Sequence, residues 1–362
     1  MTAGTVAAKG QVGSGTPIWG IRPTRQPGVP TAVLPESCDV LVVGGGITGL
    51  ALVHWLRGRA GAVLVERDRI GAGASGRNAG FLLAGVSSCY AVAVRRYGRA
   101  RAAALWQFTA DTHDLLAAAL DGRASAYRRL GGVTQAGGPE ERLDLAESAD
   151  LLGDDGFPVE HREGRLVNPR DGELDPVEAL EIFAADAAPG IIREGVEVVG
   201  LETGQGGVRV HSLGGACRAG VVVLATNAYT PLLVPGVGIR PIRAQVAATA
   251  PSSHRLVDRP TYADRGFQYW RQLIGGRVLA GGYRDRDLEH EVGYDTRPSR
   301  LVQEYLTAHL RALGAGTQIT HRWAGIMGFT PDALPLVGCL PDLPNVYFAV
   351  GFTGGGMGYG PL

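Results

Sequence analysis

One stretch constrains the fold of this chain more than any other: an apolar strand that runs into a glycine-rich turn and then a helix. The predicted strand covers residues 38–43, and the turn, Gly44 to Gly49, matches G-x-G-x-x-G. A second apolar run at 62–65 ends in Glu66. This order of strand, turn, helix, strand and acidic residue predicts a parallel α/β sheet that binds a dinucleotide.

The glycines of the motif have separate functions. Gly44 makes the tight turn, Gly46 lets a pyrophosphate approach the backbone because it has no Cβ, and Gly49 lets the helix pack close to the strand. The helix that begins near Ile47 directs free N–H groups at the phosphates. Glu66 would accept hydrogen bonds from ribose hydroxyls, and its charge would repel a 2′-phosphate, which argues against NADP. The motif alone leaves NAD and FAD open.

Composition excludes several classes of partner. The 362 residues suffice for two domains, and the formal net charge is zero. We therefore expect no nucleic-acid partner, and no apolar run approaches the ~20 residues of a membrane span. The cysteines form no C-x-x-C pair, so we expect neither a metal site nor a disulfide framework.

The first 35 residues are rich in Gly, Pro and Thr and lack the apolar core of a signal peptide. We expect a mobile or surface-draped arm there, and a cytoplasmic location by default. The sequence leaves the oligomeric state open.

Periodicity predicts the remaining elements. Helices are expected at 99–120, at 299–313 and after the Asp175-Pro176 start signal, and a buried strand at 220–225. Strand-like segments at 195–201 and 208–210 precede it. Short alternating strands at 245–249, 267–272 and 277–281 predict an antiparallel sheet, and a strand at 345–350 ends in a glycine turn. The fold class is therefore α/β with an inserted antiparallel-sheet domain of α+β type.

A second glycine-rich run, residues 71–80, follows Glu66. Small residues let the backbone lie against a ligand. Arg77 supplies a charge suited to phosphate, and Asn78 supplies both a donor and an acceptor.

Five separated motifs then specify a family. They are VVGGGITGL at 42–50, SGRNAG at 75–80, YGRA at 97–100 with ALW at 104–106, WAGIMGFTPD at 323–332 with LPLVG at 334–338, and GFTG at 351–354. Together they resemble the D-amino-acid-oxidase-like superfamily of FAD oxidoreductases. Within it the chain is most similar to the branch of gamma-glutamylputrescine, glycine and sarcosine oxidases.

The resemblance implies a Rossmann-like FAD-binding domain assembled from residues 36–90, 165–235 and 320–362. A substrate or cap domain would comprise residues 91–164 and 236–319, and residues 1–35 would form the arm. The family continues past the final glycine turn with a helix, whereas this sequence stops at Leu362. We therefore expect weakened FAD retention in a protein that ends there.

The resemblance also implies which residues hold FAD. Val198 would contact the adenine through its backbone, Glu66 the ribose, and the turn at 351–357 the flavin pyrimidine edge. The full predicted cofactor set is Gly44, Gly46, Ile47, Thr48, Gly49, Glu66, Arg67, Ser75, Gly76, Arg77, Asn78, Ala79, Gly80, Val198, Ala225, Thr226, Gly325, Gly351, Phe352, Thr353, Gly354, Gly355, Gly356 and Met357.

The implied reaction is oxidation of a primary or secondary amine. A hydride would pass to flavin N5, the imine would hydrolyse, and O₂ would reoxidise the flavin to give H₂O₂. Tyr269 and Arg271 lie on the strand expected to face the flavin, where Arg271 would hold a carboxylate and Tyr269 would wall an amine pocket. His321 is the third catalytic candidate. The alternative is that these side chains belong to a core or surface face of the sheet.

Three departures from the family keep alternatives open. Gly325 stands near the place of a cysteine that bonds the flavin in sarcosine-oxidase relatives, so we expect noncovalent FAD. Ala280 replaces a lysine that promotes the reaction with O₂, and Gly358 replaces one that holds a substrate carboxylate. The loss of the lysine at Ala280 leaves open a dehydrogenase with another electron acceptor, and the missing C-terminal helix leaves open a flavin-binding protein without turnover.

Overall fold

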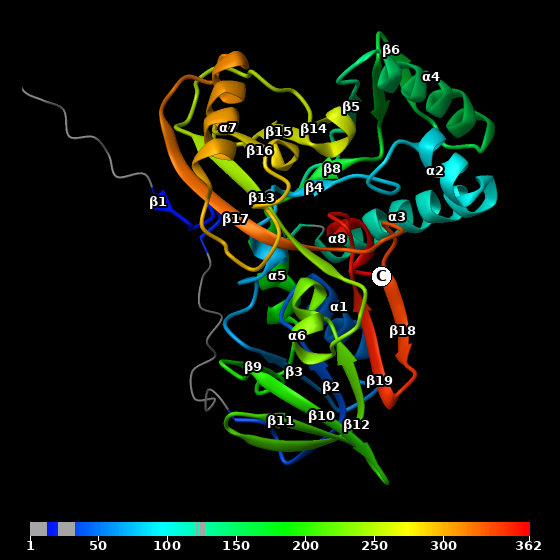
Figure 1. Ribbon diagram of the computed structural model, residues 1–362, viewed down its shortest axis with the longest axis vertical. Coiled ribbons are helices and arrows are strands. Elements are labelled where there is room, and N and C mark those ends of the chain that lie inside the picture. Colours follow the sequence, from blue (N-terminus) through cyan, green and yellow to red (C-terminus); the bar gives the residue numbers. More distant parts are fainter. Residues whose placement is uncertain (1–12, 21–32, 121, 124–126) are drawn as a thin grey trace, which may run out of the picture.

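Two large sheets organise the molecule in the computed structural model, which describes residues 13–20, 33–120, 122–123 and 127–362. In Figure 1 the eight-stranded sheet occupies the lower half and the nine-stranded sheet the upper half. A two-stranded sheet pairs β4 (Phe81–Leu82) with β8 (Gly172–Glu173). The predicted α/β fold with a second, largely antiparallel sheet is confirmed.

The eight-stranded sheet has the parallel core that the glycine motif predicts. Strands β12, β2, β3 and β9 lie parallel in that order, and β19 is parallel to β12. Strands β10 and β11 extend the sheet antiparallel, as β18 does beside β19. The strands are β2 (Ser37–Val43), β3 (Ala62–Glu66), β9 (Ile192–Glu194), β10 (Val198–Gly204), β11 (Gly207–Ser212), β12 (Gly215–Leu224), β18 (Leu336–Leu340) and β19 (Leu343–Val350).

Side chains of β2 alternate between two cores. Val42 packs with residues of helices α1 (Ile47–Leu56) and α5 (Pro176–Ala185), whereas Leu41 and Val43 pack with β11 and β12 on the opposite face. Full burial of each such side chain contributes about 1.5–3 kcal/mol. Helix α5 begins as predicted, because Asp175 Oδ1 accepts hydrogen bonds from Val177 N at 2.9 Å and Glu178 N at 3.2 Å.

The nine-stranded sheet has the order β1-β17-β13-β16-β15-β14-β5-β7-β6 and is antiparallel except at two pairs. Its strands are β1 (Gly13–Ser14), β5 (Gly132–Gln135), β6 (Glu160–Arg162), β7 (Arg165–Asn168), β13 (Arg240–Thr249), β14 (Thr261–Ala263), β15 (Gln268–Gln272), β16 (Val278–Gly282) and β17 (Ile319–Phe329). Helix α7 (Arg300–Ala312) covers one face and buries Val302, Leu306 and Leu310 against Trp270 and Ala280.

Some of the remaining helices lie between the two sheets, and others lie at the upper right, beside one end of the nine-stranded sheet (Figure 1). They are α2 (Tyr90–Tyr97), α3 (Arg99–Leu120), α4 (Pro139–Asp154), α6 (Thr230–Leu233), α8 (Gly356–Tyr359) and the short 3-10 turns η1 (Ala74–Gly76), η2 (Asn227–Tyr229), η3 (Asp264–Gly266) and η4 (Arg284–Arg286). Helix α3 has the predicted bounds. Helix α4 lies in the acidic stretch for which the sequence indicated only a change of region.

Sheet membership differs from the predicted domain boundaries at two places. Strand β7 and strand β17 belong to the nine-stranded sheet, although residues 165–168 and 320–329 were assigned to the FAD-binding domain. The register explains this, since β17 pairs with β13 along almost its whole length. The division of the chain into two domains stays a prediction.

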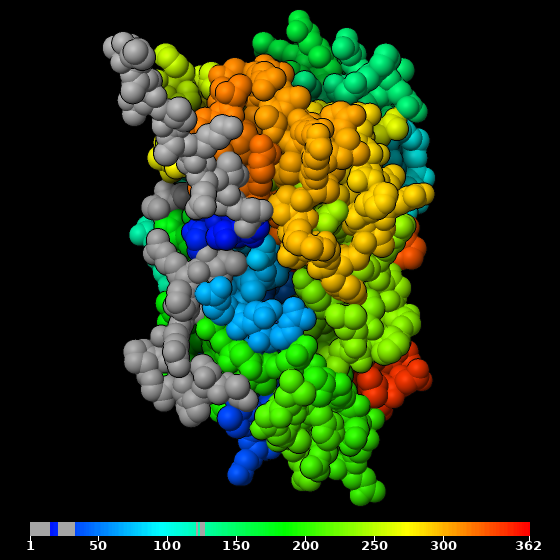
Figure 2. Space-filling view, turned by 60° about the vertical axis from the view of Figure 1, so that its left-hand side comes forward, coloured from blue at the N-terminus to red at the C-terminus, as the bar shows by residue number. Residues whose placement is uncertain are grey.

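Part of the N-terminal arm, which we expected to be mobile or draped over the surface, packs on the surface of the nine-stranded sheet. Strand β1 pairs with β17, and Ile18 and Trp19 pack against a buried cluster that contains Val246 and Trp323. Trp19 Nε1 donates to the Asn78 carbonyl at 3.0 Å. Figure 2 shows residues 13–20, in dark blue, seated on this face of the molecule. The rest of the predicted arm lies outside the described residues, apart from 33–35.

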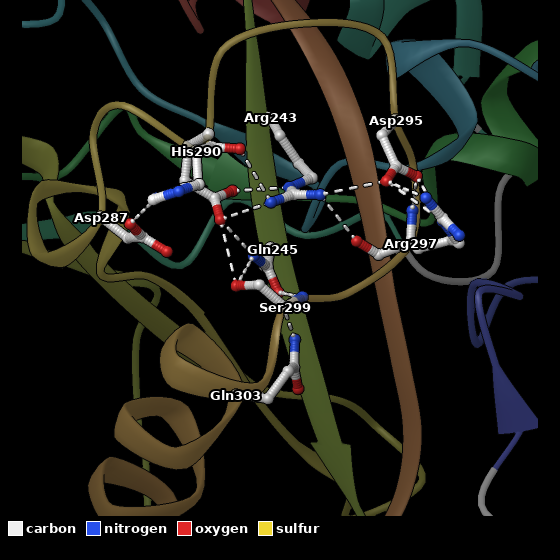
Figure 3. Close-up of polar contacts among 9 residues, drawn as sticks. Arg243, Gln245, Asp287, His290, Asp295, Arg297, Ser299 and Gln303 are labelled. Carbon is white, nitrogen blue, oxygen red and sulfur yellow. Dashed lines mark hydrogen bonds and ion pairs between the residues drawn. The ribbon is translucent and has the colours of Figure 1, made fainter.

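A buried ion pair fixes the loop between β16 and α7 (Figure 3). Arg243 on β13 donates from Nε and Nη2 to the two carboxylate oxygens of Glu291, each at 2.8 Å. Gln245 and Ser299 also donate to Glu291, whose side chain is fully buried. Hydrogen bonding to Glu291 raises the pKa of the Arg243 guanidinium. The four side chains of this network all have hydrogen-bond partners within it. The network therefore holds the loop against the sheet.

Candidate active site

A cavity of about 650 Å³ lies where the two sheets meet. From the eight-stranded sheet it is lined by Gly46, at the carboxyl end of β2, and by Ala225, at the carboxyl end of β12. From the nine-stranded sheet it is lined by Val246, Tyr269 and Gly325. The carboxyl ends of parallel strands are where open α/β sheets bind ligands.

The glycine turn forms one end of the cavity. Ile47 N, in the first turn of α1, donates to Ser75 Oγ at 3.0 Å. Gly46 N has no hydrogen-bond partner among the described residues. A Cβ at Gly46 would lie 2.9 Å from Ser75 Oγ, so only glycine leaves this approach to the backbone open.

Glu66 braces this turn from the neighbouring strand. Its Oε2 accepts a hydrogen bond from Gly45 N at 2.7 Å, and its Oε1 accepts one from Asp68 N at 2.8 Å. Burial raises the pKa of the Glu66 carboxyl, and the two backbone donors oppose that rise. Each oxygen can accept a further bond, so the predicted contact with a ribose is compatible with this geometry.

Arg77 holds the small-residue loop in place through its Nε and Nη1 atoms. Its Nε donates to the Ala72 carbonyl at 2.8 Å, and its Nη1 donates to the carbonyls of Gly15 and Ala324 at 3.0 and 3.1 Å. Burial lowers the pKa of this group. Arg77 lines the cavity, but its hydrogen bonds give it a mainly structural role, which is to connect the loop to β17.

The final glycine turn is tied to the end of β12. Asn227 Oδ1 accepts a hydrogen bond from Gly351 N at 3.0 Å, and Thr353 N donates to the Gly328 carbonyl at 2.8 Å. A Cβ at Gly328 would lie 2.8 Å from Asn227 Oδ1, so glycine is needed where these segments cross. Residues 352–358 then line the cavity.

Aromatic side chains form the wall on the nine-stranded sheet. The ring of Tyr269 lies 5.7 Å from that of Phe81 in an edge-to-face contact and 6.3 Å from the stacked ring of Tyr262. All three residues line the cavity. Burial raises the pKa of Tyr269 to about 12, so its hydroxyl remains protonated at neutral pH.

Two of the three predicted catalytic residues lie outside this cavity. Arg271 is 2 % exposed and donates to the carbonyls of Gly80 and Leu174, at 3.2 and 2.8 Å, beside the Glu173 carboxylate. Burial lowers its pKa to about 10. His321 is half-buried on β17 next to β1 and shares a 3.0 Å hydrogen bond with Thr320.

The cavity brings most of the predicted cofactor residues together. Those that line it are Gly46, Ile47, Thr48, Ser75, Arg77, Asn78, Ala79, Ala225, Gly325, Phe352, Thr353, Gly354, Gly355, Gly356 and Met357. Those beyond its lining are Gly44, Gly49, Glu66, Arg67, Gly76, Gly80, Val198, Thr226 and Gly351. Several of the second set shape the turns behind the lining.

Sequence reasoning did not single out several lining residues. Tyr262 and Phe329 line the cavity from the nine-stranded sheet, Arg284 lines it from η4, and Asp171 lines it from the loop after β7. Asn227 could have been identified from the sequence, because it directly follows the predicted strand end at Ala225 and Thr226. Phe329 lies in the WAGIMGFTPD motif at 323–332, whereas Tyr262, Arg284 and Asp171 belong to no motif that we identified.

The structure locates Ala280 and Gly358, where the family carries lysines, and Gly325, where sarcosine-oxidase relatives carry a cysteine. The Ala280 side chain packs with Trp270 and the residues of α7, so it points away from the cavity. Its neighbour Gly281 lies directly opposite Tyr269. Gly325 and Gly358 both line the cavity.

Comparison with known proteins decides the family. A family model described as FAD dependent oxidoreductase (DAO) matches residues 39–362. The chain belongs to this family. The predicted family, its fold and its FAD cofactor are therefore confirmed.

The relatives of this FAD dependent oxidoreductase are distant but span most of it. Mitochondrial sarcosine dehydrogenase of Homo sapiens is 26% identical over 361 residues, which cover 91% of this chain but only 39% of that protein. Gamma-glutamylputrescine oxidoreductase of Escherichia coli is 29% identical, with 91% of this chain and 82% of that protein covered.

Solved structures support the fold. Glycine oxidase from Geobacillus kaustophilus superposes with a TM-score of 0.74 at 22% identity, covering 90% of this chain and 92% of that one. L-proline dehydrogenase from P. horikoshii gives a TM-score of 0.73 at 22% identity, covering 91% of each chain.

The residues present fit FAD. The open approach at Gly46, its unpaired amide and the start of α1 suit a pyrophosphate. From there the cavity continues without a break past Ser75 and Ala79 to Met357. An extended dinucleotide needs such a path.

Two observations concern other kinds of site. None of the helices in the described part of the chain has both the length and the apolarity that a membrane span requires. Among the same residues, no group of three or more His, Cys, Asp or Glu side chains is arranged to hold a metal ion.

Proposed function

We propose that this protein oxidises a primary or secondary amine with noncovalently bound FAD. The observation that carries the proposal is the continuity of the cavity, which runs from the glycine turn to an aromatic wall at Phe81 and Tyr269. The names of the relatives support an amine as the donor, since sarcosine and gamma-glutamylputrescine both carry an oxidisable amine.

Residues of both sheets would hold the cofactor. Gly46 and the first amides of α1 would bind the pyrophosphate, Glu66 the ribose, and the turn at 352–357 the flavin end. Gly325 supports noncovalent binding, because it offers no sulfur to the flavin. When bound, the flavin supplies an acceptor for the hydride that leaves the carbon next to the amine.

The chain's own contribution is orientation and exclusion of water. Phe81, Tyr262 and Tyr269 wall the cavity with rings, which favours the uncharged amine that hydride transfer requires. The Tyr269 hydroxyl stays protonated and is available as a donor to the substrate. Preorganised donors and a dry wall are the usual protein contribution in cofactor enzymes.

We further propose O₂ as the electron acceptor, with imine hydrolysis and H₂O₂ as the outcome. A dehydrogenase that passes electrons to another acceptor is the second candidate. It is supported by the lack of lysine in the described residues, because the only lysine of the chain is Lys9. Ala280 also packs against α7 rather than into the cavity.

The test has two stages. The purified protein is first mixed anaerobically with amino acids, N-methyl amino acids, polyamines and acylated diamines, and bleaching of the flavin absorbance is recorded. Bleaching by an amine supports the proposal. A flavin that no amine bleaches would identify a flavin-binding protein without turnover.

Amines that bleach the flavin are then tested in air with an oxygen electrode and a peroxide assay. Stoichiometric O₂ uptake and peroxide support the oxidase. Bleaching without O₂ uptake, together with reduction of an added quinone or dye, identifies the dehydrogenase.

A further inference from the structure

Asp171 is a buried carboxylate in the cavity wall, and only one of its two oxygens is engaged within the described chain. It follows β7, lines the cavity and is 6 % exposed. Its Oδ1 accepts hydrogen bonds from Ala84 N at 2.9 Å and from Asn168 Nδ2 at 2.7 Å. Its Oδ2 has no hydrogen-bond partner among the residues that the structure describes. The carboxylate therefore retains bonding capacity for a ligand that donates a hydrogen bond.

The backbone around Asp171 holds this carboxylate in place. Gly131 N donates to the Asp171 carbonyl at 2.9 Å, and Asp171 N donates to the Asn168 carbonyl at 3.3 Å. A Cβ at Gly132 would lie 2.8 Å from Asp171 Oδ2, so glycine leaves space beside the unengaged oxygen. A group that is fixed before a ligand arrives needs little ordering when the ligand binds.

Asp171 lies near the final glycine turn. Ala84, whose amide it engages, lines the cavity together with Leu83. A Cβ at Gly358 would lie 3.4 Å from the Leu83 carbonyl oxygen. The carboxylate therefore belongs to the end of the cavity where the turn at 352–357 would hold the flavin.

The other groups of the wall that titrate are engaged or keep their protons. Among the described residues, neither histidine nor lysine lines the cavity. Glu140 is exposed and pairs with Arg265, and Asp144 pairs with Arg95. Each oxygen of Glu141 accepts a hydrogen bond from a backbone amide. Burial raises the pKa of the phenols and of the thiol that line the cavity, so these groups stay protonated at neutral pH.

The surroundings of Asp171 place its titration close to neutral pH. Burial raises its pKa to about 8, and the hydrogen bonds from Ala84 N and Asn168 and the charge of Arg129 oppose this rise. A proton acceptor is most effective when its pKa lies near the pH at which the protein works.

The ionisable groups next to Arg129 do not change charge in the same range. Asp114, on α3, pairs with Arg129 at 2.7 Å and with Arg170 at 2.6 Å, and its pKa is lowered by these cations. His113 is buried on the same helix, and burial lowers its pKa to about 4, so its ring is neutral above that pH. A titration near pH 8 therefore belongs to Asp171.

We propose that Asp171 binds the ammonium group of the substrate and accepts its proton, as a catalytic residue of the amine oxidation. One N–H bond of the ammonium breaks, an O–H bond forms at Oδ2, and the products are a neutral amine and a carboxylic acid. Only the neutral amine can lose a hydride from the adjacent carbon. The acid returns its proton to water after the product leaves. This inference rests on the proposed function and adds the group that performs its first step.

The proposal predicts that protons leave the protein when an amine binds. Below pH 8 most of the free protein carries a proton on Asp171, since the pKa of that carboxyl is about 8. An ammonium ion pairs with the carboxylate only after this proton has passed to the solvent. Binding should therefore release about 0.9 protons at pH 7 and about 0.1 at pH 9.

The first test uses tert-butylamine as the probe. The carbon that bears its nitrogen has no hydrogen, so the flavin cannot take a hydride from it. Isothermal titration calorimetry of the FAD-loaded protein, in two buffers of different ionisation enthalpy, gives both the Kd and the number of protons released. Asp171→Asn should raise the Kd at least tenfold and abolish the release at pH 7.

Asp144→Asn is the matched control, because it removes a carboxylate from the same wall that Arg95 already engages. It should leave the Kd within twofold and the proton release unchanged. The proposal is overturned if the unmodified protein does not bind the probe, if it binds without releasing protons, or if Asp171→Asn binds equally well. Thermal unfolding and FAD content of each variant separate a lost site from a lost fold.

The second test follows flavin reduction by the amine that bleaches it best, at saturating amine and a series of pH values. In the unmodified protein the rate constant should rise with pH along the ionisation of Asp171, near pH 8. Asp171→Asn should be slower by about 100-fold, the lower end of what a positioned proton acceptor contributes. Its remaining pH dependence should follow the ionisation of the amine itself.

The two proposals fail in different ways. Proton release that depends on Asp171, with a flavin that no amine bleaches, would remove the proposed function and leave the ammonium site standing. Bleaching by amines at the same rate in the unmodified protein and in Asp171→Asn would do the reverse.

Discussion

The Tyr269 ring lies across the backbone of Gly281, the residue that faces it on the neighbouring strand. A Cβ at Gly281 would lie 2.1 Å from a carbon of that ring. The glycine therefore provides the space in which the ring folds over the sheet and becomes part of the cavity wall. An aromatic side chain across a strand glycine also covers backbone that would otherwise be exposed.

Gly281→Ala should push Tyr269 out of this position. We expect a loss of about 1–3 kcal/mol in the free energy of unfolding from overpacking, and slower flavin reduction by the best amine. Urea denaturation and anaerobic stopped-flow measurements check both effects. Gly275→Ala is the control, since nothing lies within 4 Å of a Cβ there. Equal behaviour of the two variants would contradict the assigned position of Tyr269.

Gly46→Ala should weaken FAD binding without unfolding the protein. The added Cβ would lie 2.9 Å from Ser75 Oγ and would fill the approach to the Gly46 amide. A tenfold rise in the Kd for FAD corresponds to about 1.4 kcal/mol, and we expect at least that. Reconstitution of the stripped protein, followed by flavin fluorescence, measures it. Gly73→Ala, where nothing lies within 4 Å of a Cβ, should bind FAD normally.

Glu291→Gln should destabilise the fold more than any substitution at the edge of its network. The change leaves the Arg243 charge buried without its acid, which costs about 3 kcal/mol or more. Chemical denaturation gives the value. Asp295→Asn is the comparison, because Asp295 is half-exposed and lies 3.8 Å from Arg243, and its effect should be small. If Glu291→Gln lowers the free energy of unfolding no more than Asp295→Asn does, the ion pair of Arg243 and Glu291 contributes little to stability.

Asp171 should make stability depend on pH. Burial raises its pKa from the ordinary 3.8 to about 8, so the folded state keeps a proton that the unfolded chain releases above about pH 4. Its contribution to stability is therefore complete at low pH and declines as pH rises from about 4 to about 8.

Asp171→Asn has no proton to lose at this position, and its amide oxygen can still accept from Ala84 N. Between about pH 4 and pH 8, the free energy of unfolding of the variant should rise relative to that of the unmodified protein by up to about 1.4 kcal/mol for each pH unit. Urea denaturation at pH 5 and at pH 7.5 tests this. Parallel pH profiles for the two proteins would show that Asp171 titrates normally.

Local signals predicted several of the secondary-structure elements well. The Gly44 to Gly49 turn, the Asp175-Pro176 helix start and the helix at 99–120 each depend on neighbouring residues, and each is present in the structure. Residues 75–80 and 351–357 were assigned to the same ligand from resemblance, and most of them do line one cavity.

Side-chain direction on the substrate sheet could not be predicted in the same way. Arg271 was expected at the flavin, but the carbonyls of Gly80 and Leu174 that engage it come from distant segments. Arg284 stands in a short turn that has no motif of its own, and its place depends on Gly266 and Phe329. Such contacts depend on strand register, which periodicity alone does not determine.

The bonds of Arg77 have a consequence for the order in which the molecule assembles. Its two hydrogen bonds to Gly15 and Ala324 span 62 and 247 positions of the chain. Contacts of such long range form slowly, because the entropy of closing large loops must first be overcome. During synthesis, the loop at 72–80 has to wait for β17 before it gains its last support. Competence to bind the cofactor should therefore appear late in folding, well after the glycine turn itself has formed.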